Sequence, residues 1–114
     1  MKTTQTRILS EEERRTLDQA LEIIRKHLPH ARIILYGSRA RGEARRDSDY
    51  DLLVLTPHKI SSDIEDAIFD ETYDVLLKTG QWISVRHIDH STWDSPVVRG
   101  SPFYEEVNRD GVEL

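Results

Sequence analysis

The amino-acid sequence predicts an α/β (α+β) domain in which helices pack on a small mixed β-sheet. Two observations predict this class. Apolar residues recur at helical spacing in two long segments, and short runs rich in β-forming residues alternate with those segments. The chain of 114 residues has the length of one domain and can bury a core without disulfides. We therefore expect residues 1–114 to form a single domain.

The N-terminal third is predicted to contain a loose lead-in, a helix and a strand. Residues 1–9 are polar and form the lead-in. Ser10 and Glu13 make a capping box that starts the helix, and Pro29 ends it. Residues 33–36 are β-formers and predict a strand that stops at the following glycine. The helix presents an apolar face made by Leu17, Leu21, Ile24 and Leu28.

The middle third continues with a polar connection, a second strand and a second long helix. Residues 37–48 are predicted as a turn, one or two helical turns and a loop, and residues 50–56 as the strand. Ser62 with Glu65 is another capping box, and Gly80 is a suitable C-terminal stop for the helix.

The C-terminal third is predicted to hold a third strand over residues 82–88, followed by a loop that contains Pro96 and Gly100. Ser101 then caps a short last helix with a proline in its first turn. Residues 112–114 can add a short edge strand. The predicted order is therefore helix, strand, short helix, strand, helix, strand, helix.

Composition excludes several classes of function. The net charge of −5 argues against a protein that coats nucleic acid, so we expect no direct nucleic-acid binding. The absence of cysteine excludes thiolate catalysis and cysteine zinc sites, and it fits a cytoplasmic location. No apolar run is long enough for a membrane span, so no membrane partner is expected. No Gly-Lys-Ser/Thr sequence occurs, which excludes a P-loop.

The Gly37-Ser38 pair follows the first predicted strand and is the first half of a candidate site. Glycine lets the backbone turn sharply and lets a ligand approach the main chain. The Ser38 hydroxyl and the next amides can donate to a phosphate, and a helix starting at Arg39 would favour an anion. Positive potential nearby comes from Arg39, Arg41, Arg45 and Arg46.

Asp49 and Asp51 form the second half of the candidate site. Their i, i+2 spacing places both carboxylates on one face of a strand, where they repel each other unless a cation lies between them. Mg²⁺ is the natural candidate because it prefers oxygen ligands and is often held by one or two carboxylates plus phosphates. Residues 52–55 are apolar at every position, which predicts a central strand covered on both sides.

These two halves together resemble a known signature. Gly37-Ser38, ten intervening residues and then Asp49-Tyr50-Asp51 are similar to the motif of the nucleotidyltransferase superfamily that includes DNA polymerase beta and kanamycin nucleotidyltransferase. The string over residues 36–44 resembles the minimal nucleotidyltransferase (MNT) group, whose members are little more than the catalytic core. The resemblance implies the nucleotidyltransferase fold, a small mixed sheet with helices packed against it.

The resemblance also implies an activity. Members transfer a nucleoside monophosphate from a nucleoside triphosphate to a hydroxyl, here AMP from ATP. Gly37 and Ser38, with Arg39 beside them, would bind the triphosphate, and Asp49 and Asp51 would bind Mg²⁺ and serve catalysis. Many stand-alone bacterial MNT proteins are similar to MntA-type antitoxins paired with a helical HEPN-domain ribonuclease toxin. The resemblance therefore implies a HEPN toxin as partner and as acceptor of AMP.

One departure from the superfamily pattern concerns catalysis. Members usually have a third carboxylate on a neighbouring strand, where it acts as general base and metal ligand. The third predicted strand contains no acid, and Ser84 or Arg86 occupies the expected position. Asp89 lies directly after this strand and is the candidate replacement, with Asp94 further on. The competing interpretation is that Asp89 caps a turn.

Two other functions stay open at this point. One is a binding module, an antitoxin that neutralises its partner by contact and catalyses little, which the missing third carboxylate favours. The other is modification of a small molecule, as in aminoglycoside transferases, although those usually use an extra domain to hold the acceptor. The intact Gly37-Ser38 and Asp49-Tyr50-Asp51 elements favour the enzyme.

Overall fold

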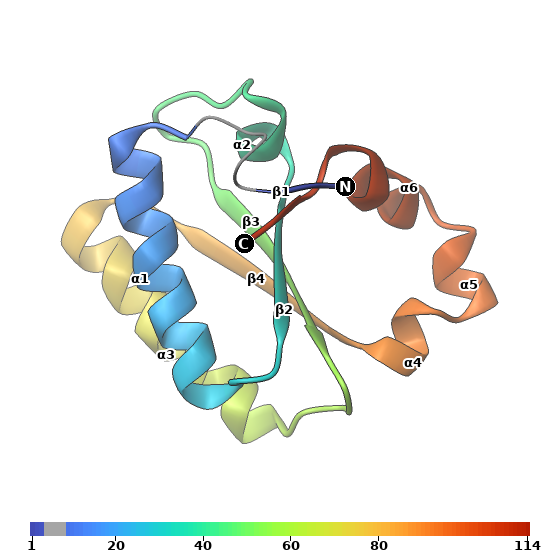
Figure 1. Cartoon of the computed structure of the whole chain (residues 1–114). Coiled ribbons are helices and arrows are strands. Elements are labelled where there is room, and N and C mark those ends of the chain that lie inside the picture. Colours follow the sequence, from blue (N-terminus) through green and yellow to red (C-terminus); the bar gives the residue numbers. More distant parts are fainter. Residues whose placement is uncertain (4–8) are drawn as a thin grey trace.

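The computed structural model describes residues 1–3 and 9–114, which form one mixed five-stranded sheet with helices on both faces (Figure 1). The strand order is β1-β5-β2-β3-β4. β2 runs antiparallel to β3 and β5, whereas β4 runs parallel to β3 and β1 parallel to β5. The predicted fold class is therefore confirmed. The strands are β1 (Lys2–Thr3), β2 (Arg32–Tyr36), β3 (Tyr50–Thr56), β4 (Ile83–Asp89) and β5 (Val112–Glu113).

The helices form two layers with the sheet between them (Figure 1). α1 and α3 cover one face, and α4, α5 and α6 cover part of the other, while the single turn α2 connects β2 to β3. None of the helices in the described part of the chain is both long and apolar enough to cross a bilayer. Their bounds are α1 (Glu11–His27), α2 (Ser38–Arg41), α3 (Ser62–Thr79), α4 (His90–Trp93), α5 (Pro96–Arg99) and α6 (Pro102–Asp110).

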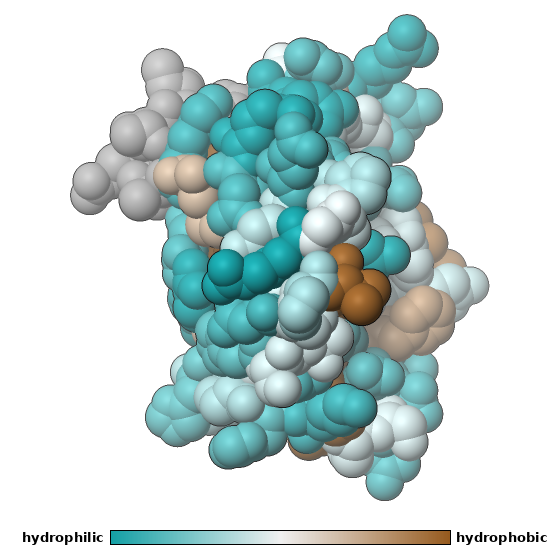
Figure 2. All heavy atoms as spheres, turned by 90° about the vertical axis from the view of Figure 1, so that its right-hand side faces the viewer, coloured by the Kyte–Doolittle hydropathy of each residue, from teal (hydrophilic) through white to brown (hydrophobic). Residues whose placement is uncertain are grey.

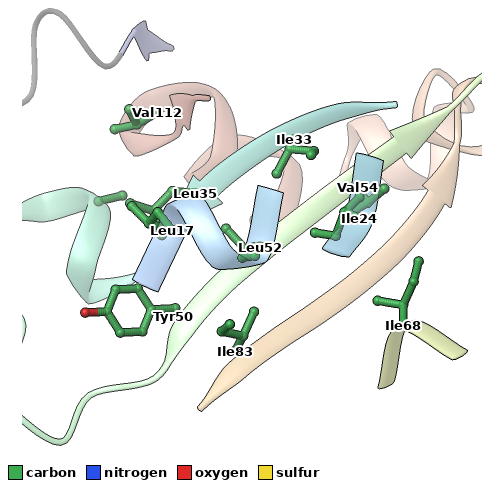
Figure 3. Packing of buried hydrophobic residues seen from close by; sticks show 12 residues of the cluster. Leu17, Ile24, Ile33, Leu35, Tyr50, Leu52, Val54, Ile68, Ile83 and Val112 are labelled. Carbon is green, nitrogen blue, oxygen red and sulfur yellow. The ribbon is translucent and has the colours of Figure 1, made fainter. Parts of the chain in front are cut away.

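β3 lies at the centre of the core, as its uninterrupted apolar run predicts. Leu52 and Val54 point towards α1 and α3, where they join the larger apolar cluster (Figure 3). Leu53 and Leu55 point the other way and pack with Trp93 and the α6 helix in a second cluster. Burying each leucine stabilises the fold by roughly 1.5–3 kcal/mol relative to leaving it exposed. This two-sided burial fixes which residues of β3 share a face.

Helix starts follow the capping signals, with one shift. The Ser10 hydroxyl accepts from the Glu13 N–H at 3.0 Å and the Glu13 carboxylate accepts from the Ser10 N–H, which confirms the first capping box. At α3 the cap is Ser61 rather than Ser62, because Ser61 is the extended residue whose hydroxyl accepts from the Ile64 N–H at 3.3 Å. The prediction was wrong there by one residue.

The segment predicted as a loop after the third strand contains two single-turn helices instead. Asp89 caps α4 and Ser95 caps α5, with Pro96 in the first turn of α5. Proline is tolerated at that position because its missing N–H would have no helical partner there. The prediction of a loop here was wrong, because Pro96 lies in the first turn of a helix.

The two chain ends also differ from the prediction. The C-terminal strand β5 exists, but it lies between β1 and β2 and is not an edge strand. Its outer neighbour is β1, from the lead-in predicted to be loose. Residues 4–8 of that lead-in lie outside the described residues. The pairing was missed because a two-residue strand carries no periodicity of its own.

Candidate active site

Three neighbouring strands bring Tyr36, Asp51 and Ser84 into one row across the sheet. Tyr36 of β2 is the register partner of Asp51 on β3, and Asp51 is the register partner of Ser84 on β4. Asp51 has the parity of Leu53, so it lies on the face that carries α6. Further along this face the sheet is covered by α4 and α6, so the row lies where the buried strands emerge.

The turn at Gly37 contacts this row directly. Gly37 has a φ of +75°, and a Cβ built on it would lie 2.5 Å from Oδ2 of Asp51. A residue with a side chain would therefore be strained and would also collide with the carboxylate. α2 begins immediately after, with the Gly37 carbonyl accepting from the Ala40 N–H at 3.1 Å. The structure thus brings Gly37 and Asp51 together, with Ser38 next in the chain.

Electrostatics at Asp51 favour a bound cation. Burial raises the pKa of the Asp51 carboxyl above its usual range, and the nearby charges of Asp49 and Glu106 raise it further, while Arg41 opposes them. Asp49 and Asp51 therefore act on each other as the i, i+2 spacing predicts. A carboxylate that is disfavoured by its like-charged neighbours gains free energy when a cation binds between them.

The donor set fits Mg²⁺ that arrives with a nucleotide. Within the described residues, no group of three or more histidine or acidic side chains is placed to hold a metal ion. Asp49 and Asp51 therefore offer a two-carboxylate set. Mg²⁺ usually keeps several waters and takes one or two carboxylates plus substrate phosphates, so these two oxygen-bearing side chains suit it.

The position expected for a third carboxylate holds Ser84. It lies opposite Asp51 in the parallel β3–β4 pair. Arg86 is the next residue of β4 on the same face, and its guanidinium lies over the Phe103 ring at 4.4 Å. Phe103 also packs edge-on against Tyr36 at 5.1 Å. This side of the site is therefore bounded by a hydroxyl, a cation and an aromatic pair.

Asp89 is not close to this row. It pairs with Thr56, five residues along β3 from Asp51, which corresponds to about 17 Å along a strand. Its carboxylate accepts from the Thr92 N–H at 3.2 Å and from the Thr92 hydroxyl at 2.7 Å. The structure therefore does not support Asp89 as the third carboxylate. Because β4 runs parallel to β3, its C-terminal end lies at the other end of the sheet from Asp51.

Arg39 lies beside the turn, but its guanidinium points to the opposite face of the sheet. The side chain is 7% exposed, stacks on the Tyr50 ring at 4.1 Å and pairs with Glu13 of α1 at 3.4 Å. It also donates to the Ser48 carbonyl at 2.9 Å. We expected Arg39 to bind the nucleotide. Its side chain instead fastens the loop before β3 to α1.

Two site residues were not found from the sequence. Arg41 of α2 pairs with Glu106 of α6 at 3.2 Å, and both influence the pKa of Asp51. Arg41 was noted as part of a basic run, without a role of its own. Glu106 had no detectable signal, because helical spacing predicts which side of α6 is buried but not which strand it meets. The packing of α6 against β2 places this carboxylate near the site.

A Gly-Ser turn pressed against an Asp-x-Asp strand on a mixed sheet is the arrangement expected of a nucleotidyltransferase core. The nucleotidyltransferase domain family model matches residues 17–106, and the chain therefore belongs to this family. The match includes the Gly37 turn and the strand of Asp51. Among curated proteins, no relative matches the sequence significantly.

Solved structures with the same fold include toxin–antitoxin complexes. A toxin–antitoxin structure with AMP-PNP has a TM-score of 0.55 at 20% identity, covering 84% of this chain and 69% of that chain. An MntA–HpeT variant gives 0.54 at 18% identity, with coverages of 84% and 69%. A tri-AMPylated Shewanella oneidensis HEPN toxin with its MNT antitoxin gives 0.52 at 16% identity, with coverages of 88% and 69%. At these identities the likeness shows a shared fold.

Proposed function

We propose that this chain transfers AMP from ATP to a hydroxyl on a helical HEPN-type toxin and acts in the cytoplasm as its antitoxin. The observation that carries the proposal is the contact between the Gly37 turn and Asp51. It brings the turn proposed to bind phosphate against the carboxylate proposed to bind the metal, within a chain of the nucleotidyltransferase family. The nucleotide and the partner are suggested by relatives of the same fold, which were solved with AMP-PNP and with an AMPylated HEPN toxin.

Each residue of the site has a proposed role. Gly37, Ser38 and the first turn of α2 bind the phosphates, with Arg41 adding positive charge. Asp49 and Asp51 would hold Mg²⁺, which would neutralise charge on the transferring and leaving oxygens. The acceptor hydroxyl oxygen forms a bond to the α-phosphorus, the bond to the β-phosphate oxygen breaks, and pyrophosphate leaves. The hydroxyl proton passes to water, since β4 offers no acid beside Asp51.

A second candidate function rests on Ser84. Without a carboxylate in this position the chemistry loses a base, and a chain that binds nucleotide and partner while transferring little would still neutralise a toxin. This candidate and the enzyme share the same fold and the same partner. They differ in whether AMP is found covalently on the toxin.

The nucleotide site is tested first by calorimetry of Mg²⁺-ATP against ATP with a chelator. We expect binding to need the cation, because Asp49 and Asp51 repel each other without it. Losing a residue of the second coordination shell already costs metal sites about 10–100-fold in affinity. Asp51→Asn should therefore weaken Mg²⁺-ATP binding by at least about 100-fold. Asp47→Asn, the same change at an exposed loop position, is the matched control.

Transfer is tested separately, with ATP labelled at the α-phosphate and the protein encoded by the neighbouring gene. Label on that protein with wild type, and not with Asp51→Asn, supports the enzyme. Neutralisation of the toxin without label selects the binding antitoxin. Equal ATP affinity with and without chelator contradicts the metal site itself.

A further inference from the structure

The outer edge of β4 is an open strand. β4 is the last strand of the sheet, and in the described part of the chain no strand lies beyond it. The Trp82 carbonyl accepts from the Tyr50 N–H at 2.8 Å, and bonded residues alternate along a strand. Ile83, Val85 and His87 consequently direct their N–H and C=O groups away from β3. Seven residues without proline or glycine form an edge that natural proteins usually shorten, bend or cover.

A groove runs along this edge between β4 and α3. One part has a volume of about 290 Å³ and is lined by Ile68, Phe69, Trp82 and Val85 among others. A second part of about 320 Å³ continues towards the C-terminal end of β4. Both parts include His87. The groove therefore accompanies the strand along most of its length, on the face opposite Asp51.

Exposed aromatic side chains form the rim of the groove. Phe69 and Tyr73 are stacked at 6.1 Å, and Trp82 meets both rings edge-on at 5.8 and 6.3 Å. Phe69 is 52% exposed and Tyr73 45%. Aromatic side chains clustered at the surface are enriched in protein interfaces, where they supply a large contact area. The face formed by α4, α5 and α6 is by contrast mostly hydrophilic, with small apolar patches (Figure 2).

The charges of the residues that line the groove indicate which kind of segment binds there. Glu65 and Asp66 line the groove and Asp70 follows on the same helix. The C-terminal part of the groove adds one cation, Lys59, and one further carboxylate, Asp89, so carboxylates predominate. Burial lowers the pKa of His87, which disfavours its charged form. A second copy of this chain, paired edge to edge about a two-fold axis, would bring these carboxylates together and be repelled. A segment that carries lysine or arginine would instead be attracted.

We propose that the outer edge of β4 binds an extended, lysine- or arginine-rich segment of a partner protein as an additional strand. Backbone groups of Ile83, Val85 and His87 pair with the segment, and its apolar side chains enter the groove against Phe69 and Trp82. This surface lies on the other face of the sheet from Asp51, so the partner can dock while the site stays open. This proposal rests on the proposed function only in the choice of candidate partner, the protein encoded by the neighbouring gene.

Hydrogen exchange on the complex with the protein encoded by the neighbouring gene tests the pairing. The Val85 and His87 amides should exchange at least about tenfold more slowly in the complex, because an added strand bonds them. The Ser84 and Arg86 amides, already bonded to β3, are protected in both states. Phe69→Asp should weaken the complex by at least about tenfold. Val97→Asp, an apolar residue 85% exposed on α5, is the matched control and should leave it unchanged.

Several outcomes overturn the proposal. A complex whose Val85 and His87 amides are unchanged places the partner elsewhere, and a dimer of the isolated chain formed through β4 selects the second copy. If the neighbouring protein does not bind, a fluorescent heptapeptide alternating lysine and valine is titrated, with a glutamate–valine peptide as control. If the lysine–valine peptide binds no more tightly than the glutamate–valine peptide, the proposal is also wrong. If no AMP transfer is detected but the Val85 and His87 amides are still protected in the complex, the proposed function is wrong and the proposed binding surface is supported.

Discussion

The two ends of the β3–β4 pair each carry an aspartate, and the two carboxylates lie in opposite environments. Asp51 is partly buried against Gly37 and faces other acids, so burial and the neighbouring Asp49 raise its pKa. Asp89 caps α4, and its hydrogen bonds with Thr92 lower its pKa. The charged form of the carboxylate is therefore disfavoured at Asp51, whereas hydrogen bonds stabilise it at Asp89.

This difference separates a binding residue from a structural one. A carboxylate that its own fold already satisfies has little to gain from a ligand, whereas Asp51 gains when a cation arrives. Ionisable groups perturbed by burial and by like charges are characteristic of functional sites. The contrast assigns Asp51 to the site and Asp89 to the fold, although both lie near strand ends and the sequence analysis considers both as catalytic residues.

The largest expected effect would come from giving the site the carboxylate it lacks. Ser84→Asp places an acid opposite Asp51, in the row where the superfamily pattern has one. A general base typically contributes about 10²–10⁴ in rate. We expect AMP transfer to rise by about 10² or more, measured as label incorporated into the partner under single-turnover conditions.

Ser84→Asn is the control for this substitution, because it changes size in the same way without adding a base. If Ser84→Asp transfers AMP no faster than wild type, the site does not need an acid on β4. The absence of a carboxylate beside Asp51 would then not limit the rate of transfer. An equal gain in both variants points to packing and not to proton transfer.

A smaller effect is expected from the backbone turn beside Asp51. Gly37 and Gly80 have nearly the same positive φ, +75° and +77°, but a Cβ on Gly80 would meet nothing within 4 Å. Alanine should cost about 1–2 kcal/mol of stability at either position through backbone strain. At Gly37 the new Cβ also displaces the Asp51 carboxylate.

Calorimetry and thermal unfolding of the two alanine variants separate these causes. Gly37→Ala should weaken Mg²⁺-ATP binding by about tenfold or more, a loss of about 1.4 kcal/mol. Gly80→Ala should bind normally despite a similar loss of stability. Equal binding by both variants would mean that the close approach to Asp51 has no role in the site.

Most of the fold followed from local patterns in the sequence. The apolar residues of β3 predicted a strand covered on both sides, and capping residues placed the start of α1. The contact between the turn and Asp51 was predictable because antiparallel β2 and β3, joined by a short connection, bring the end of one beside the start of the other. Local signals sufficed wherever the partners were adjacent along the chain.

The remaining features depend on contacts between distant segments. Nothing near Arg39 in the sequence indicates that its side chain turns towards Glu13, and nothing near Glu106 indicates that α6 reaches Arg41. Asp89 was placed wrongly because its closeness to the end of β4 was noted without the parallel direction of that strand. The positions of these side chains depend on tertiary packing and on strand direction, which cannot be predicted from local patterns in one sequence.

The smallest expected effect compares the two aspartates directly through stability. For Asp51 the folded-state pKa is raised, so its charge destabilises the fold above that pKa, and the penalty disappears as the pH falls through it. For Asp89 the folded-state pKa is lowered, so its stabilisation is present above the ordinary value and is lost as the pH falls. Asp51→Asn should therefore stabilise the chain at pH 7, by on the order of 1 kcal/mol, and Asp89→Asn should slightly destabilise it. Urea unfolding should show Asp51→Asn converging on wild type between pH 7 and about pH 4, whereas Asp89→Asn should converge on it from the opposite side only below about pH 4, where Asp89 becomes protonated. AMP transfer should be lost in Asp51→Asn and retained in Asp89→Asn. Two shifts of the same sign would contradict the assignment of these carboxylates to different roles.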